Sequence, residues 1–166
     1  MTRKVLPWPD KRLQTVAAPV AEITDEIRAI WNDMIDVMEA MPGVGLGAPQ
    51  IGVMQRLAVV DASDKRGQAV RMANPEILHA SAELRTHEEA SPNLPGVSAA
   101  VDRPRAVTVR FMNEHGEMED RDFVNLWATS VQHQIDHLNG KMYFDRLSRT
   151  KRQMLLKRAG KIRGRT

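Results

Sequence analysis

The chain has 166 residues, of which 42% are apolar, and a formal net charge of +3. This length supports one substantial hydrophobic core, so we expect a single domain over residues 1–166. The absence of cysteine excludes disulfides, thiolate nucleophiles and zinc sites with sulfur ligands, and the absence of a membrane-length apolar run or a secretory signal predicts a cytoplasmic protein that does not contact membranes.

The first half of the chain predicts one long helix and two short strands. Thr24 is suited to cap the helix, and the Pro-Gly pair at 42–43 must end it. Its apolar residues recur every three or four positions, as on one buried face: Ile27, Ile30, Trp31, Met34, Val37, Met38 and Met41. A glycine-rich segment, 43–52, follows the helix. The strands expected after it are 57–61 and 70–72.

The second half predicts a hairpin and another helix. Residues 106–112 alternate as a strand, 113–116 form a turn, and 117–123 return as the second strand. A helix is expected over 124–138, because the Asn-Gly pair that follows it is a good helix terminator.

Positive charge is concentrated at the C-terminal end. From Lys141 onward there are ten basic residues and one acidic residue, whereas the preceding part holds fourteen basic and twenty acidic residues. A helix over 150–162 is expected to bury one apolar face, made of Met154, Leu155, Ala159 and Ile162. The basic tail, 146–166, should attract polyanions, although a solvated helix face is an alternative reading. Its cations are Arg146, Arg149, Lys151, Arg152, Lys157, Arg158, Lys161, Arg163 and Arg165.

Two histidines lie one helical turn apart in the segment QHQIDHLNG, residues 132–140. His133 and His137 project from the same helix face, at the spacing of metal-binding helices. In HExxH sites a glutamate follows the first histidine and takes a proton from the metal-bound water. Gln134 stands there in this chain, and an amide does not titrate. Two polar histidines without a metal are the alternative for this pattern alone.

Three ordered segments resemble the motifs of peptide deformylase, a metal hydrolase that removes the formyl group from N-terminal formyl-methionine. GVGLGAPQIG resembles GxGLAAPQxG, EASPNLPGV resembles EGCLSxPGV, and QHQIDHLNG resembles QHExDHLxG. The resemblance implies an α+β fold, with antiparallel strands around the central helix that bears the two histidines and with N-terminal and C-terminal helices. It also implies nascent peptide N-termini as partners, and ribosomal RNA as the partner of the basic tail.

Some site residues agree with the family pattern. His133 and His137 match two metal ligands of the family. Gln50 matches the glutamine that holds the substrate carbonyl, although a hydrogen bond that orders the glycine-rich turn is an alternative. Gly45 lies in the same motif beside the expected substrate position, but tight backbone packing explains a glycine there better.

Other positions depart from the pattern. Ser91 stands at the third metal ligand, a cysteine in the family, and a neutral hydroxyl is a poorer donor than a thiolate. Pro92, at a substrate-binding position, lacks the backbone N–H that the family offers to the oxyanion. Gln134 replaces the catalytic glutamate.

These departures favour a degenerate homologue with impaired or absent deformylation and a lost metal site. We then expect no cofactor at full occupancy, and at most weakly bound zinc, iron or nickel. The alternative is an active deformylase or amidase with an unusual metal site, in which His87, Glu88 or Glu89 supplies a ligand, although Glu89 is better suited to a salt bridge. A binding module that docks on ribosomes through its tail is the third hypothesis.

Overall fold

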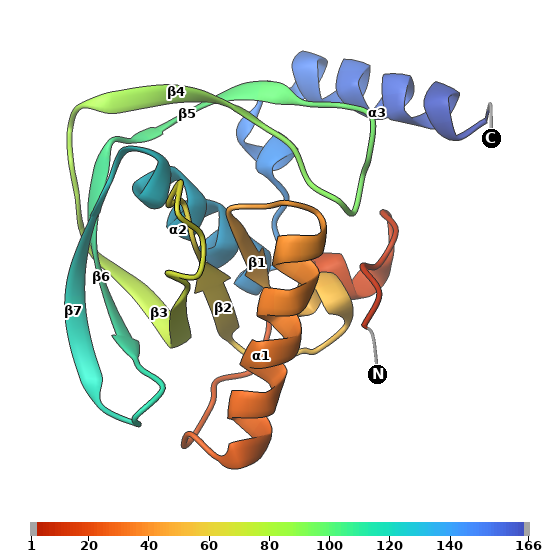
Figure 1. Ribbon diagram of the computed structural model, residues 1–166. Helices are drawn as coiled ribbons and strands as arrows, with labels where there is room; N and C mark the ends of the chain where they lie inside the picture. Colours follow the sequence, from red (N-terminus) through yellow and green to blue (C-terminus); the bar gives the residue numbers. More distant parts are fainter. Residues whose placement is uncertain (1–2, 165–166) are drawn as a thin grey trace.

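The computed structural model describes residues 3–164, so Arg165 of the expected basic tail lies outside the described residues (Figure 1). The helices are α1 (Asp25–Ala40), α2 (Asn125–Leu138) and α3 (Arg149–Arg163), with short 3-10 turns η1 (Lys11–Gln14), η2 (Ala48–Ile51) and η3 (Tyr143–Arg146). The strands are β1 (Gly45–Gly47), β2 (Leu57–Val60), β3 (Val70–Ala80), β4 (Leu84–Glu89), β5 (Ala99–Pro104), β6 (Ala106–Met112) and β7 (Met118–Val124).

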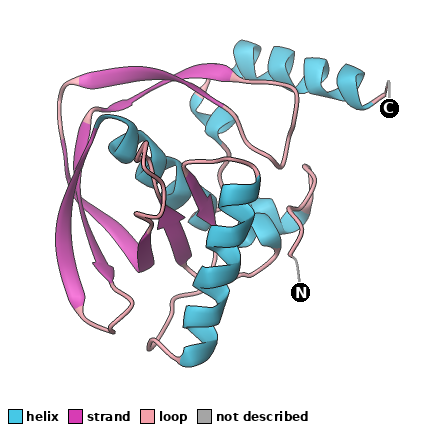
Figure 2. Ribbon diagram, viewed as in Figure 1, coloured by secondary structure: helices cyan, strands magenta, loops and turns pink. Residues whose placement is uncertain are grey.

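The strands form two antiparallel sheets around α2. One sheet has the order β1-β2-β3-β6-β7, and the other pairs β4 with β5 (Figure 2). Helix α2 contacts strands of both sheets, and α1 packs outside against β1 and β2. This arrangement confirms the predicted α+β fold with a central histidine-bearing helix.

Helix α1 follows the predicted pattern. The Thr24 hydroxyl accepts a hydrogen bond from the Ile27 backbone N–H at 3.2 Å, which satisfies one free donor of the first turn. Trp31, Met34 and Met38 are fully buried and pack with residues of β1 and β2 in one hydrophobic cluster. The helix ends before the Pro-Gly pair, as predicted.

Helix α2 is buried along most of its length. Every residue from Ala128 to Leu138 is buried, and the helix is capped at Asn139, as predicted. Because this stretch includes histidine, glutamine and aspartate side chains, their polar atoms must find partners inside the protein or face a cavity.

The structure differs from the prediction in four strands. The glycine-rich segment contains β1, which pairs with β2, and the strand predicted at 70–72 continues to Ala80. Irregular pairing between β3 and β6 disturbs its alternation. Strands β4 and β5 were not predicted, because charged residues occupy their buried positions: Glu89 in β4 and Arg103 in β5.

Helix α3 buries less than predicted. Leu155 and Ala159 pack into a cluster with residues of the segment after β4 and of η3, and Ile162 joins it partly buried. Met154, expected on the same face, is instead 61% exposed, which corrects that prediction. No helix within residues 3–164 is long and apolar enough to cross a membrane.

Candidate functional site

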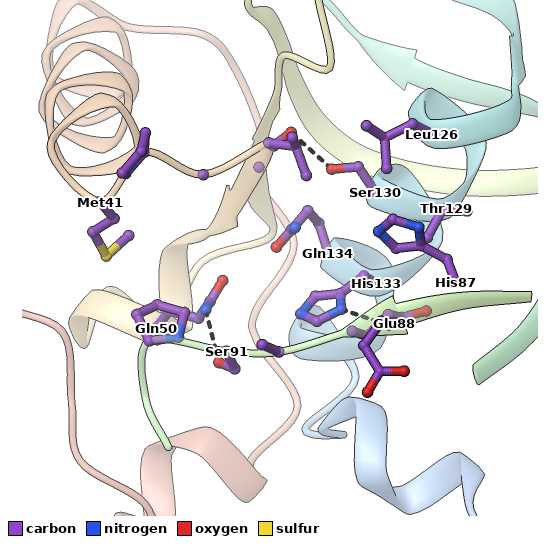
Figure 3. Close-up of a pocket in the computed structure, with 17 residues that line it drawn as sticks. Met41, Gln50, His87, Glu88, Ser91, Leu126, Thr129, Ser130, His133 and Gln134 are labelled. Carbon is purple, nitrogen blue, oxygen red and sulfur yellow. Dashed lines mark hydrogen bonds and ion pairs between the residues drawn. The ribbon is translucent and has the colours of Figure 1, made fainter. Parts of the chain in front are cut away.

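The three motif segments meet at one cavity of about 420 Å³. Its walls come from the segment between α1 and β1, from the end of β4 and the loop after it, and from one face of α2 (Figure 3). Gly45, Gln50, Ser91, Pro92 and Gln134 all line it, and so does His133. Residues far apart in the sequence are thus brought together at one cavity.

The two histidines of α2 face each other through their Nε2 atoms. The His133 and His137 Nε2 atoms are 3.1 Å apart, and both side chains are buried. Burial, reinforced by the neighbouring charges of His133 and Arg103, lowers the pKa of His137 well below its ordinary value. The imidazole of His137 is therefore neutral near pH 7, as a metal ligand must be. Its Nδ1 atom is buried and has no hydrogen-bond partner among residues 3–164.

Glu89 fixes the orientation of His133. Its Oε1 atom lies 2.8 Å from His133 Nδ1, and its two oxygens accept hydrogen bonds from Arg103 at 2.6 and 2.9 Å. Burial alone would raise the pKa of Glu89, but the hydrogen bonds from His133 and Arg103 outweigh it and lower the pKa to about 2. Glu89 is therefore a carboxylate with a structural role, as its predicted salt bridge requires, and its oxygens are already engaged.

A chain of ion pairs continues from Glu89 into the core. Arg103 is fully buried and also donates to Asp136 at 2.9 Å. Asp136 in turn accepts two hydrogen bonds from Arg146, at 2.6 and 2.7 Å. This Arg103 network ties β4, β5, α2 and η3 together around the back of His133.

Gln50 and Ser91 share a partner that sequence reasoning missed. Gln50 Nε2 donates to Asn93 Oδ1 at 2.7 Å and lies 3.5 Å from Ser91 Oγ, and the Ser91 hydroxyl donates to Asn93 Oδ1 at 3.0 Å. Gln50 Oε1 accepts from the Gly47 backbone N–H at 2.9 Å. Gln50 thus orders the glycine-rich segment, its alternative role. Asn93 stands where the second motif has a serine, a departure that the sequence analysis did not weigh.

Gln134 occupies the place of the family glutamate, pressed against Gly45. A Cβ atom on Gly45 would lie 2.6 Å from Gln134 Nε2 and 2.5 Å from Ser130 Oγ, so any side chain at this position requires both neighbours to move. Gln134 Oε1 is buried, with no hydrogen-bond partner in the described part of the chain. A buried unpaired acceptor that lines a cavity suits a water molecule or a ligand N–H.

His87 reaches the same cavity from β4. His87 and Glu89 are two residues apart on β4, so both side chains lie on the strand face that is turned toward α2. Figure 3 shows the His87 ring beside Thr129. Its ring nitrogens make no hydrogen bond or ion pair with residues 3–164. The structure therefore places one more titratable side chain in the cavity wall, without any role assigned to it by the motifs.

The donors at the site fit a metal ion only in part. Two Zn–N bonds of normal length at a tetrahedral angle place the nitrogens about 3.3 Å apart, close to the 3.1 Å between the His133 and His137 Nε2 atoms. Within residues 3–164, however, no three His, Asp or Glu side chains form a group that could hold a metal. A third protein ligand would have to be another kind of group, such as the Ser91 hydroxyl.

Comparison with known proteins gives consistent matches along the chain. The family model described as polypeptide deformylase matches residues 2–153. A peptide deformylase of Afipia carboxidovorans is 42% identical over 158 residues, covering 94% of this chain and 92% of that protein. One from Methylocella silvestris is 40% identical over 161 residues, covering 94% of this chain and 82% of that protein.

Solved structures agree with these relatives. The crystal structure of a peptide deformylase from Legionella pneumophila superposes with a TM-score of 0.91 at 37% identity, covering 98% of this chain and 96% of that chain. A peptide deformylase from Ehrlichia chaffeensis in complex with actinonin gives 0.89 at 28% identity, with 96% of each chain covered.

These matches correct the expectation of a degenerate homologue with impaired activity and a lost metal site. Relatives about 40% identical over nearly the whole chain are named peptide deformylase, so the alternative of an active enzyme is better supported. The expectation gave decisive weight to Ser91, Pro92 and Gln134. The structure keeps the two facing imidazoles, the carboxylate that orients one of them, and the cavity in front of them.

Proposed function

Because this chain belongs to the peptide deformylase family, we propose that it hydrolyses the N-terminal formyl amide of nascent peptides, releasing formate and a free amine. The observation that carries this proposal is the cavity in which the three motif segments meet in front of His133 and His137, whose Nε2 atoms lie 3.1 Å apart. The centre is an unusual one for the family, since Ser91 and Gln134 stand at the third ligand and at the glutamate position.

His133 and His137 are the residues that would hold a divalent cation, such as zinc, iron or nickel, with Ser91 at the third position. When bound, such a cation lowers the pKa of water and polarises a carbonyl oxygen. Glu89 supports this role, because it holds His133 through Nδ1 and so leaves the lone pair of His133 Nε2 to bind the cation.

The remaining residues position the reactants. Gln134 Oε1 is a buried acceptor that no described residue engages, so it can accept a hydrogen bond from the attacking water and orient it. The water adds to the formyl carbon, the C–N bond breaks, and the leaving amine takes a proton. Because Gln134 takes up no proton, the water must pass its proton to the amine or to solvent. Pro92 offers no N–H to the carbonyl oxygen. Gln50 Nε2 can serve as the side-chain donor there by exchanging its 3.5 Å contact with Ser91 Oγ for the carbonyl oxygen.

Formate release from N-formyl-methionyl peptides tests this function. The protein is loaded separately with zinc, iron or nickel, and formate and the new α-amino group are quantified together. A His133→Ala, His137→Ala double variant is the control, since it removes both nitrogen donors. We expect formate release above this control with at least one metal. Release that never exceeds the control with any of the three metals would overturn the proposal.

We further propose that α3 binds ribosomal RNA. Most of its basic side chains are exposed, and the helix lies at the periphery of the molecule (Figure 1). Such a surface attracts phosphates with a strong dependence on salt. The test variant carries three substitutions in α3: Lys157→Glu, Arg158→Glu and Lys161→Glu. The charge-matched control carries three at exposed lysines outside α3: Lys4→Glu, Lys11→Glu and Lys65→Glu. We expect only the first to lose co-sedimentation with ribosomes, and equal sedimentation of the two would refute this proposal.

A further inference from the structure

Asn93 joins the site residues Gln50 and Ser91 to the N-terminal segment of the chain. It is 1% exposed, and its backbone carbonyl accepts a hydrogen bond from the Trp8 N–H at 2.8 Å. Its side-chain Nδ2 donates to the Leu6 carbonyl at 2.7 Å and to the Gln50 carbonyl at 3.1 Å. The family motif has a serine at this position, so these side-chain bonds belong to the asparagine of this chain.

These bonds fix the direction of the Asn93 amide. The Leu6 and Gln50 carbonyl oxygens can only accept, so Nδ2 faces them and Oδ1 faces the other way. Asn93 Oδ1 lies 2.7 Å from Gln50 Nε2 and 3.0 Å from Ser91 Oγ. The Gln50 amide is fixed in the same way, because its Oε1 accepts from the Gly47 N–H at 2.9 Å. Since Asn93 Oδ1 can only accept, the hydroxyl proton of Ser91 must point at it.

The direction of this proton decides what Ser91 offers to the cavity that it lines. A hydroxyl has one proton to donate and two lone pairs. Two N–H groups approach the Ser91 oxygen, the Asn93 backbone at 3.4 Å and Gln50 Nε2 at 3.5 Å. Both distances exceed the roughly 2.7–3.2 Å of an ordinary hydrogen bond, so neither group holds a lone pair firmly. Ser91 therefore presents lone pairs, and no proton, to a bound group.

We propose that Asn93 is a positioning residue that accepts the Ser91 proton and so holds the Ser91 oxygen as a neutral ligand for a divalent cation. Without this partner the hydroxyl is free to turn its proton toward the cation. The asparagine suits a hydroxyl and not a thiolate, which has no proton to donate and would face a second acceptor in Asn93 Oδ1. Ser91 and Asn93 thus depart from the family motif as a matched pair. This inference rests on the cation site of the proposed function.

The test is a double-mutant cycle of Asn93→Ala and Ser91→Cys, with zinc affinity measured by calorimetric titration of the metal-free protein. In the parent background, Asn93→Ala should lower zinc affinity about tenfold, because the hydroxyl loses the group that orients it. In the Ser91→Cys background the same substitution should raise zinc affinity about threefold, because it removes an acceptor that faces the thiolate. A merely structural role of Asn93 would lower zinc affinity in both backgrounds.

Two control variants separate the site from the fold. Asn74→Ala is the matched control, because the Asn74 amide also ties the N-terminal segment down, through two bonds of 2.8 Å to the Val20 backbone, but does not line the cavity. It should leave zinc affinity unchanged in both backgrounds. The His133→Ala, His137→Ala double variant removes both nitrogen donors, so the zinc that it fails to bind is the zinc held at the histidine pair.

Asn93→Asp keeps the test decisive even where Asn93→Ala does not fold. Aspartate has the same shape and keeps an oxygen that accepts the Ser91 proton, so zinc affinity should not fall in the parent background but should fall in the Ser91→Cys background. Effects of one sign in both backgrounds, or a parent that binds no more zinc than the histidine double variant, would overturn the inference. If no formate is released but zinc affinity follows the expected signs, the proposed function fails and the role of Asn93 stands.

Discussion

Replacing Arg103 by methionine should destabilise the protein far more than an exposed arginine would. Arg103 is fully buried and makes hydrogen bonds of 2.6 and 2.9 Å to Glu89 and of 2.9 Å to Asp136. Methionine fills similar space but leaves the Glu89 carboxylate without its main partner. Breaking a buried ion pair on one side costs about 3–5 kcal/mol. Asp136 keeps both bonds from Arg146, so we expect the lower end, about 3 kcal/mol.

Arg105→Met is the matched control, two residues along the chain. Its side chain is 51% exposed and pairs with Glu83 at 2.8 Å on the surface, where such a pair is worth about 0–1 kcal/mol. Urea unfolding at pH 7 gives the free energy of unfolding of both variants. Adding Glu89→Gln to Arg103→Met should recover part of the loss, because it removes a buried charge that keeps only His133 as a partner. Equal losses for the two arginine variants would refute the view that the Arg103 network stabilises the site.

Three further predictions concern the site. Gln134→Glu supplies a proton acceptor, so formate release should rise, by about 10²–10⁴ in kcat/KM, and an unchanged rate would show that proton transfer does not limit turnover. Ser91→Cys supplies a thiolate, so the protein should retain more zinc after dialysis against a chelator, measured by elemental analysis; equal retention would mean that position 91 does not contact the metal. The pKa of Glu89 is lowered to about 2 from 4.5, so it contributes stability that is fully present above pH 4.5 and is lost as the pH falls toward 2. The free energy of unfolding should therefore fall less over that range in Glu89→Gln than in the parent, and parallel curves would contradict this assignment.

The fold was predictable wherever burial follows apolar periodicity. Helix α1 and strand β6 show it, because their buried residues are apolar and recur at helix or strand spacing. In the β4–β5 pair burial does not follow apolar periodicity, because its buried side chains include Glu89 and Arg103. These two residues are buried only because they pair with each other and with groups on α2. That pairing depends on the tertiary structure and leaves no periodic signal in the sequence.

The site was predictable where a motif names a residue and unpredictable where a contact depends on packing. The histidine pair, Gln50 and Ser91 were identified from the motifs, and the structure brings them to one cavity or directly behind it. Asn93, which bonds both Gln50 and Ser91, was missed. The exposure of His87 to the cavity follows from strand alternation, but only once β4 is known to be a strand.

The contact between Gly45 and α2 makes tolerance at one position depend on two others. A methyl group at position 45 would overlap both Ser130 Oγ and Gln134 Nε2. Glutamine and glutamate side chains have the same length, so Gln134→Glu would leave the steric restriction at position 45 in place. A library randomised at position 45 should return glycine in either background, whereas shortening both neighbours to alanine should admit alanine there. The residues tolerated at position 45 therefore depend on those at positions 130 and 134, and they report how closely α2 approaches the glycine-rich segment.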